Sequence, residues 1–278
     1  MDANHPNHRG MPTSTLAWAK PAPGVWQAIG LIALYFALQL SVGGVIAIAA
    51  GLVEWVRHGG EVAAVFSMGR HWLGASDASA IAVMLTLLVS ATVMLRLIGR
   101  WWPGLMRQST LPGFGFARSR HAGMYVLALG FGLVMPLIGG MLTQWLAQGH
   151  QVSQDIKQLG TNISLPLRLP LAVLVISLGP LVEEALFRGV LLSSCARSLG
   201  SGWAVVLTAV LFACVHLPDL GFLWYALPNL ALLGLGLGWL RVASGSIWPA
   251  RYFRRAIASI FLRLSRNTST FSLPSPSK

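Results

Sequence analysis

The chain has 278 residues, of which 55% are hydrophobic and only 10% are charged. Soluble domains carry about 25% charged residues, so the composition excludes an ordinary water-soluble enzyme. Twenty Lys and Arg residues against eight Asp and Glu residues give a formal net charge of +12. Because these basic residues lie in segments between apolar runs, the charge indicates membrane topology and argues against binding to nucleic acid.

Six apolar runs are long enough, or nearly so, to cross a bilayer as helices, which takes about 20 residues each. We therefore expect an all-α fold, a polytopic membrane helix bundle with six clear transmembrane helices and a degraded or missing C-terminal span. The predicted spans are residues 26–53, 79–98, 124–146, 169–192, 203–217 and 222–240. Residues 1–25 are polar and Pro-rich, so we expect a cytoplasmic segment there and no cleaved signal peptide.

The basic residues fall mostly on one side of this predicted bundle. By the positive-inside rule, we expect an integral protein of the cell (inner) membrane with a cytoplasmic N-terminus. The other side would then hold only Arg57, Arg70, Lys157 and Arg168. The predicted cytoplasmic side holds Arg9, Lys20, Arg96, Arg100, Arg107, Arg118, Arg120, Arg197, Arg241 and the basic tail.

The fourth span contains three charged residues, Glu183, Glu184 and Arg188. A charge at the bilayer centre costs about 2.5–3.5 kcal/mol, so its default interpretation is a functional site. Glu184 and Arg188 are four residues apart and can pair on one helical face. Glu183 points about 100° away and keeps a carboxylate for chemistry, while Gly179-Pro180 permits a bend beside it. The alternative is a structural ion pair that locks helices together, with Glu183 protonated.

His216 lies near the end of the fifth span. The short loop expected around Arg197 makes spans four and five antiparallel neighbours, which brings Glu183 and His216 to within about 6 Å in height. A Glu–His pair is a competent general base for activating water, whereas a lone His on an apolar helix is more often a packed or interfacial residue. Cys214 points to another face and is expected to be a small apolar side chain.

The Gly-Leu-Gly-Leu-Gly run at residues 234–238 lies within an apolar span. Small residues let membrane helices approach each other closely. We therefore expect this run to serve helix packing.

These motifs resemble those of the CPBP family of intramembrane proteases, which includes the CAAX prenyl endopeptidases and bacterial Abi or bacteriocin-processing proteins. The family's Glu-Glu-x-x-x-Arg motif is matched by Glu183, Glu184 and Arg188, and its Phe-x-x-x-His motif by Phe212 and His216. The segment around Trp248 is similar to the lead-in of the third motif. The resemblance divides the chain into N-terminal membrane helices at 26–164, a protease-like core at 165–250 and a divergent tail at 251–278.

The resemblance implies a glutamate-dependent endopeptidase that acts on a membrane-embedded peptide or protein within the lipid bilayer. Glu183 and His216 would polarise the attacking water, and Glu184 and Arg188 would support Glu183. The family has been described as metalloproteases, so Glu183 and His216 could hold a divalent metal such as zinc. Catalytic zinc normally has three protein ligands, so whether a metal is needed stays open.

The third motif departs from the family pattern. Where family members carry a His and an Asn after the Trp, this chain has Arg254 and Ala258. The tail then becomes basic and Ser/Pro-rich, which favours an altered reading frame or diverged terminus over an interfacial helix with Ile257 and Phe261 on its apolar face. We expect at most weak proteolysis, with a catalytically impaired scaffold or immunity-type protein as the alternative. A proton-coupled transporter is disfavoured because spans one to three carry few polar residues.

Overall fold

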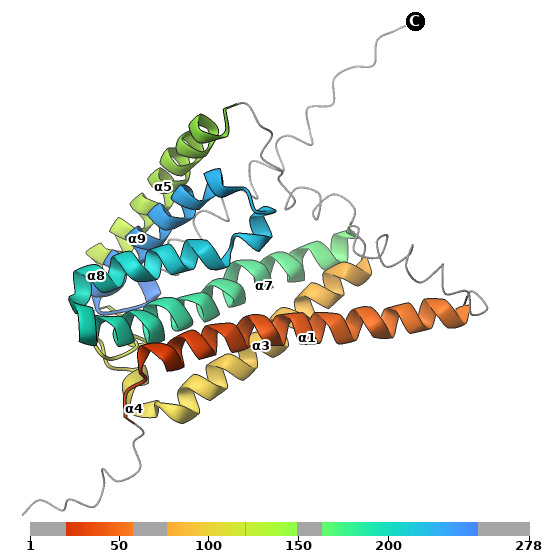
Figure 1. Cartoon of the computed structure of the whole chain (residues 1–278), viewed down its shortest axis with the longest axis horizontal. Coiled ribbons are helices and arrows are strands. Elements are labelled where there is room, and N and C mark those ends of the chain that lie inside the picture. The colour runs from red at the N-terminus through yellow and green to blue at the C-terminus, as the bar shows by residue number, and fades with distance from the viewer. Residues whose placement is uncertain (1–20, 58–76, 120, 149–162, 250–278) are drawn as a thin grey trace, which may run out of the picture.

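The computed structural model describes residues 21–57, 77–119, 121–148 and 163–249, and every regular element in these ranges is helical. The helices pack as a single bundle (Figure 1). The elements are α1 (Val25–Arg57), α3 (Asp77–Trp101), α4 (Pro103–Met106), α5 (Gly123–Ala147), α7 (Leu165–Glu183), the π-helix η2 (Glu184–Leu191), α8 (Leu192–Val215), the short 3₁₀ turns η3 (Pro218–Leu220) and η4 (Trp224–Ala226), and α9 (Leu227–Ser244).

Five helical stretches among the described residues are long and apolar enough to cross a membrane. One of them, Leu165–Val215, has 51 residues and is broken at Gly200, where the backbone reaches φ 76° and ψ 165°. The chain folds back at this glycine, so that α7 with η2 runs antiparallel to the rest of α8 (Figure 1). Counting the two arms separately gives the six predicted spans. The chain is therefore an integral membrane protein with a polytopic helical fold.

Most predicted span boundaries differ by a few residues from the helix ends in the structure, and two of the differences have a clear physical reason. The loop expected around Arg197 is helical, and the turn comes three residues later at Gly200, because a glycine can adopt the positive φ that the reversal needs. The last span begins at Leu227 and not at residue 222. Pro228 occupies the first turn of α9, where its missing N–H costs no helical hydrogen bond.

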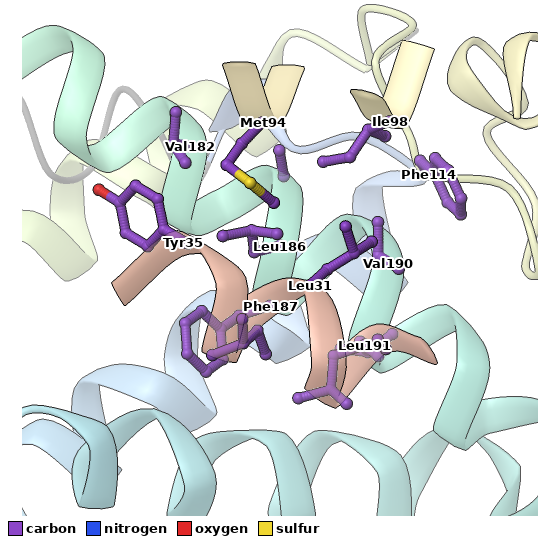
Figure 2. Packing of buried hydrophobic residues seen from close by; sticks show 14 of the residues in the cluster. Leu31, Tyr35, Met94, Ile98, Phe114, Val182, Leu186, Phe187, Val190 and Leu191 are labelled. Atoms are coloured by element: carbon purple, nitrogen blue, oxygen red, sulfur yellow. The ribbon is translucent and has the colours of Figure 1, made fainter. Parts of the chain in front are cut away.

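The core of the bundle surrounds the π-helix η2. All eight residues of η2 are buried, and its apolar side chains pack between α1 and α3 (Figure 2). The side chains around it come from both of these helices and from the loop after α4: Leu31, Tyr35, Met94, Ile98 and Phe114. The segment that carries Glu184 and Arg188 is thus held from several sides by close packing.

Helices α8 and α9 approach closely at two glycines, which confirms the packing role expected for the Gly-Leu-Gly-Leu-Gly run. A Cβ atom on Gly234 would lie 2.9 Å from the Cα of Ala209, and one on Gly238 would lie 3.0 Å from Val205 Cγ1. In contrast, a Cβ on Gly236 would make only an ordinary 3.8 Å contact with Met135.

We expect Gly234→Ala to lower stability by about 1–3 kcal/mol, the usual cost of overpacking, because the backbone of α8 cannot yield without separating the helices. Gly236→Ala is the matched control, since it adds the same methyl group on the same helix where there is room. Thermal unfolding in detergent measures both variants. Equal unfolding temperatures for Gly234→Ala and the wild type would contradict the close helix contact.

A loop between α4 and α5 fastens the end of α9 to the core. The guanidinium of Arg241, which is fully buried, donates to the carbonyl oxygens of Ser109 and Gly113. The Gly113 carbonyl also accepts from Ser193 Oγ at 2.9 Å, and Phe114 lies against Gly189 of η2. This loop therefore joins α9 to the π-helix.

The residues after α9 bind the same loop. Ile247 N donates to Gly115 O at 2.9 Å, Ser246 Oγ donates to Ala117 O at 2.6 Å, and Trp248 Nε1 donates to Phe116 O at 2.7 Å. The segment that resembles the lead-in to a third motif is thus docked on the loop backbone.

Candidate active site

The fourth predicted span changes from α-helix to π-helix at the charged residues. Pro180 lies inside α7, and because proline has no N–H it removes one hydrogen bond from the helical ladder. The π-helix begins four residues later at Glu184, and its wider repeat is seen at its end, where Leu192 N donates to Phe187 O. Such π segments are rare and occur frequently at functional sites. The sequence predicted a bend here but not the π geometry.

Glu184 and Arg188 form an ion pair on η2. Glu184 Oε1 lies 3.4 Å from Arg188 Nη1, and the two side chains are 0% and 2% exposed. The expected pairing at a spacing of four residues is thus present in the structure. In surroundings of low dielectric, each charge depends on its partner for compensation, so the pair fixes both side chains.

Glu183 and His216 meet from the two arms of the helical hairpin. His216 Nε2 lies 3.9 Å from Glu183 Oε2, and both side chains are slightly exposed, at 18% and 17%. This distance is too long for a direct hydrogen bond but suits a contact bridged by one water molecule. Among the candidate residues, these two therefore keep access to solvent or substrate while Glu184 and Arg188 do not.

The hydrogen bond on the far side of the imidazole sets its orientation. His216 Nδ1 lies 2.7 Å from the carbonyl oxygen of Phe212. Because a carbonyl oxygen only accepts hydrogen bonds, Nδ1 carries the proton in this contact. In the neutral ring, Nε2 then presents its lone pair toward Glu183.

The position of the turn explains why these residues face each other. Glu183 and His216 lie 17 and 16 residues from Gly200, on opposite sides. Phe187 and Phe212 lie 13 and 12 residues from it, and their rings are 5.2 Å apart. The height mismatch expected from a loop at Arg197 disappears once the turn is placed at Gly200.

Cys214 does not join the site. It is exposed, whereas Phe212, two residues earlier, is buried at 1% exposure. The side chain thus lies on a different face of α8 from the Phe212 ring, in line with the expectation of a small apolar residue.

The donors of the described residues do not fit a three-ligand metal site. Glu183 and His216 supply two donors, and within the described ranges no group of three or more His, Cys, Asp or Glu side chains is placed to hold a metal ion. A catalytic zinc normally has three protein ligands. The mechanism proposed below therefore uses the carboxylate and imidazole alone.

Two contacts of the site were not predicted from the sequence. The ring of Phe212 lies against both Arg188 and His216, and the loop at Gly113 and Phe114 supports η2 from outside. The Phe-x-x-x-His spacing was a signal for the first contact. The second contact depends on tertiary packing between segments about 80 residues apart, so no local sequence pattern indicates it.

Arg254 and Ala258, where the third motif departs from the family pattern, lie outside the described residues. The interfacial helix considered for the tail lies outside them as well.

Fold and site together define a polytopic membrane protein with a carboxylate–imidazole pair between two of its membrane helices. Residues 165–256 match the family model of the type II CAAX prenyl endopeptidases, Rce1-like. This part of the chain is thus similar to that family, and the resemblance to CPBP proteases that the motifs predict is confirmed for these residues. At the family level, the match supports a CAAX-type intramembrane endopeptidase. Comparison with curated proteins and with solved structures gave no match.

Proposed function

We propose that the chain is an intramembrane endopeptidase in which Glu183 and His216 activate a water molecule to hydrolyse membrane-embedded peptides or proteins. The observation that carries this proposal is the 3.9 Å approach of His216 Nε2 to Glu183 Oε2 inside the region that matches the endopeptidase family. We place the substrate in the bilayer because the helices that carry the two residues are long and apolar enough to cross one.

In the proposed reaction, the water molecule lies between the carboxylate and the imidazole. Glu183 takes one proton from the water while His216 Nε2 accepts a hydrogen bond from the other, and the water oxygen attacks the amide carbonyl carbon. The tetrahedral intermediate then breaks its C–N bond, and the proton held by Glu183 passes to the leaving nitrogen. The products are a new carboxyl terminus and a new amine.

Glu184 and Arg188 take a supporting role in this proposal. Both are buried and so do not meet substrate directly. Their ion pair fixes the turn of η2 that follows Glu183, which keeps its carboxylate opposite His216. A catalytic group held in place in advance lowers the barrier because little reorganisation is needed during the reaction.

We also propose that the N-terminus faces the cytoplasm of a cell (inner) membrane. Hydrogen bonds connect several segments at one end of the bundle. Trp102 Nε1 donates to Pro21 O, and Arg197 donates to Ala22 O and Pro23 O. Arg241 donates to Ser109 O. The excess of Lys and Arg at this end supports a cytoplasmic location. Labelling of single cysteines with a membrane-impermeant reagent tests the orientation.

The proposed function is tested with the purified chain in lipid vesicles that contain membrane-tethered peptides. In water enriched in ¹⁸O, we expect cleavage products with one ¹⁸O atom in the new carboxyl group, read by mass spectrometry. A parallel sample with chelator measures the need for metal. Absence of cleavage across a broad panel of membrane peptides would favour the alternative of an impaired scaffold protein.

We expect the turnover of the unmodified chain to be weak, because Arg254 stands where family members carry a His. Loss of one oxyanion donor costs about 10²–10³ in rate. A variant with a grafted apolar span that includes Arg254→His and Ala258→Asn should therefore cleave faster by about this factor. Equal rates for the graft and the original chain would show that the third motif is dispensable here.

A further inference from the structure

The ring of Phe212 lies between the Glu184–Arg188 ion pair and the Glu183–His216 pair. Arg188 Cζ is 4.3 Å from the ring centroid, and the imidazole of His216 is 4.5 Å from it on a tilt of 50°. The side chain is buried at 1% exposure. One aromatic ring thus contacts both the cation of the buried pair and the imidazole of the partly exposed pair.

The contact with Arg188 has the geometry of a cation–π interaction. An aromatic face carries negative charge density, and a guanidinium within about 6 Å of the centroid is attracted to it, most strongly where water is excluded. Arg188 is buried together with Glu184, so water competes little for the cation. The attraction therefore holds the Phe212 ring against η2.

Phe187 fixes the ring from another direction. The two rings are 5.2 Å apart at an interplanar angle of 88°, an edge-to-face arrangement that aromatic pairs prefer. Arg188 Cζ lies 6.0 Å from the Phe187 centroid, at the limit of the range for a cation–π contact. Of these two rings, Phe212 therefore makes the stronger contact with Arg188.

Phe212 also holds His216 through its backbone. Its carbonyl oxygen accepts the hydrogen bond from His216 Nδ1 at 2.7 Å, and His216 is the residue at which α8 ends. The imidazole is thus oriented by the ring and by the carbonyl of a single residue. A shift of this residue would move Nε2 relative to Glu183.

We propose that Phe212 is a positioning residue whose cation–π contact with Arg188 fixes the His216 imidazole opposite Glu183. The Glu184–Arg188 pair then supports the site through Phe212 as well as through the backbone of η2. This inference deepens the proposed function and rests on it for its kinetic part. The competing explanation is that the ring only fills volume in the core.

Stepwise fluorination of the ring separates these two explanations. Replacing Phe212 with its mono-, di- and trifluorophenylalanine analogues withdraws charge from the ring face with little change in size. We expect kcat to fall with each fluorine, by about tenfold in all, while KM stays nearly constant. The unfolding temperature should fall only slightly and in step with the fluorine count, because the weakened contact lies in the folded core. The same series at Phe187 is the matched control and should give a much smaller slope, because Arg188 lies farther from that ring.

A second readout does not depend on turnover. The ¹⁵N resonances of the His216 ring report its hydrogen bonding, and we expect them to shift progressively with fluorine count at Phe212 but not at Phe187. Unchanged resonances and unchanged kcat across the Phe212 series, or equal slopes at both positions, would overturn the inference. A chain that cleaves no peptide but shows the graded resonance shift would contradict the proposed function and leave the positioning by Phe212 supported.

Discussion

Glu183→Gln is expected to abolish proteolysis while the protein still inserts and accumulates in the membrane. The glutamine amide has nearly the same shape as the carboxylate but cannot take a proton from water, and general-base catalysis contributes about 10²–10⁴ in rate. The Glu183 side chain is 17% exposed, so we expect folding not to depend on its charge. The measurement is peptide cleavage by reconstituted protein, with thermal unfolding of the same samples as the check on folding.

Two matched variants sharpen this test. Glu183→Asp keeps a carboxylate but withdraws it from His216, so it should retain part of the activity that Glu183→Gln loses. His216→Asn keeps a polar side chain but loses the imidazole lone pair, and it should also reduce cleavage strongly. Near-full activity of Glu183→Gln, with unfolding temperature unchanged, would show that another group acts as the base.

The membrane fold could be predicted from the sequence because lipid imposes a simple rule on it. A helix that crosses the bilayer needs about 20 apolar residues, and such runs are visible in the composition along the chain. The ends of the spans were harder to predict, because a helix can continue past the last residue of its apolar run. Ser194 and Cys195 are still buried beyond the predicted end, and the helix that contains Arg197 continues until Gly200, where a positive φ lets the chain reverse.

The proximity of the candidate residues could also be predicted, since charges inside an apolar span stand out. The pairing of Glu184 with Arg188 follows from helical spacing, and the approach of Glu183 to His216 follows from an antiparallel hairpin. Their catalytic roles stay a prediction until activity is measured. The π-helix and the contact of Arg188 with Phe212 could not be predicted, because both depend on how side chains from α1, α3 and α8 pack around η2.

Arg241 illustrates the same limit on a single residue. From the sequence it was one of several basic residues at a span end, a surface charge that marks topology. In the structure it is fully buried and donates to backbone carbonyls of a loop more than 100 residues earlier. A guanidinium can exchange its hydrogen bonds to water for hydrogen bonds to peptide carbonyls. Which carbonyls lie within reach is decided only by the tertiary structure.

Glu184→Ala and Arg188→Ala are each expected to destabilise the protein more than the double replacement does. The two side chains are 0% and 2% exposed and 3.4 Å apart. Removing one partner leaves the other charge in surroundings of low dielectric without the opposite charge of the pair, a penalty of about 3–5 kcal/mol. The double replacement removes both charges and keeps only the cost of the lost volume. Unfolding curves in detergent for the three variants provide the comparison.

A neutral pair of similar volume, Glu184→Gln with Arg188→Met, separates charge from packing. Because a buried ion pair can be replaced by well-packed neutral side chains at little or no cost, this variant should unfold near the wild-type temperature. It should nevertheless lose activity if the cation at Arg188 positions Phe212 and His216, since methionine provides no charge for the ring face. Strictly additive losses from the two single Ala variants would instead show that Glu184 and Arg188 do not stabilise the fold as a pair.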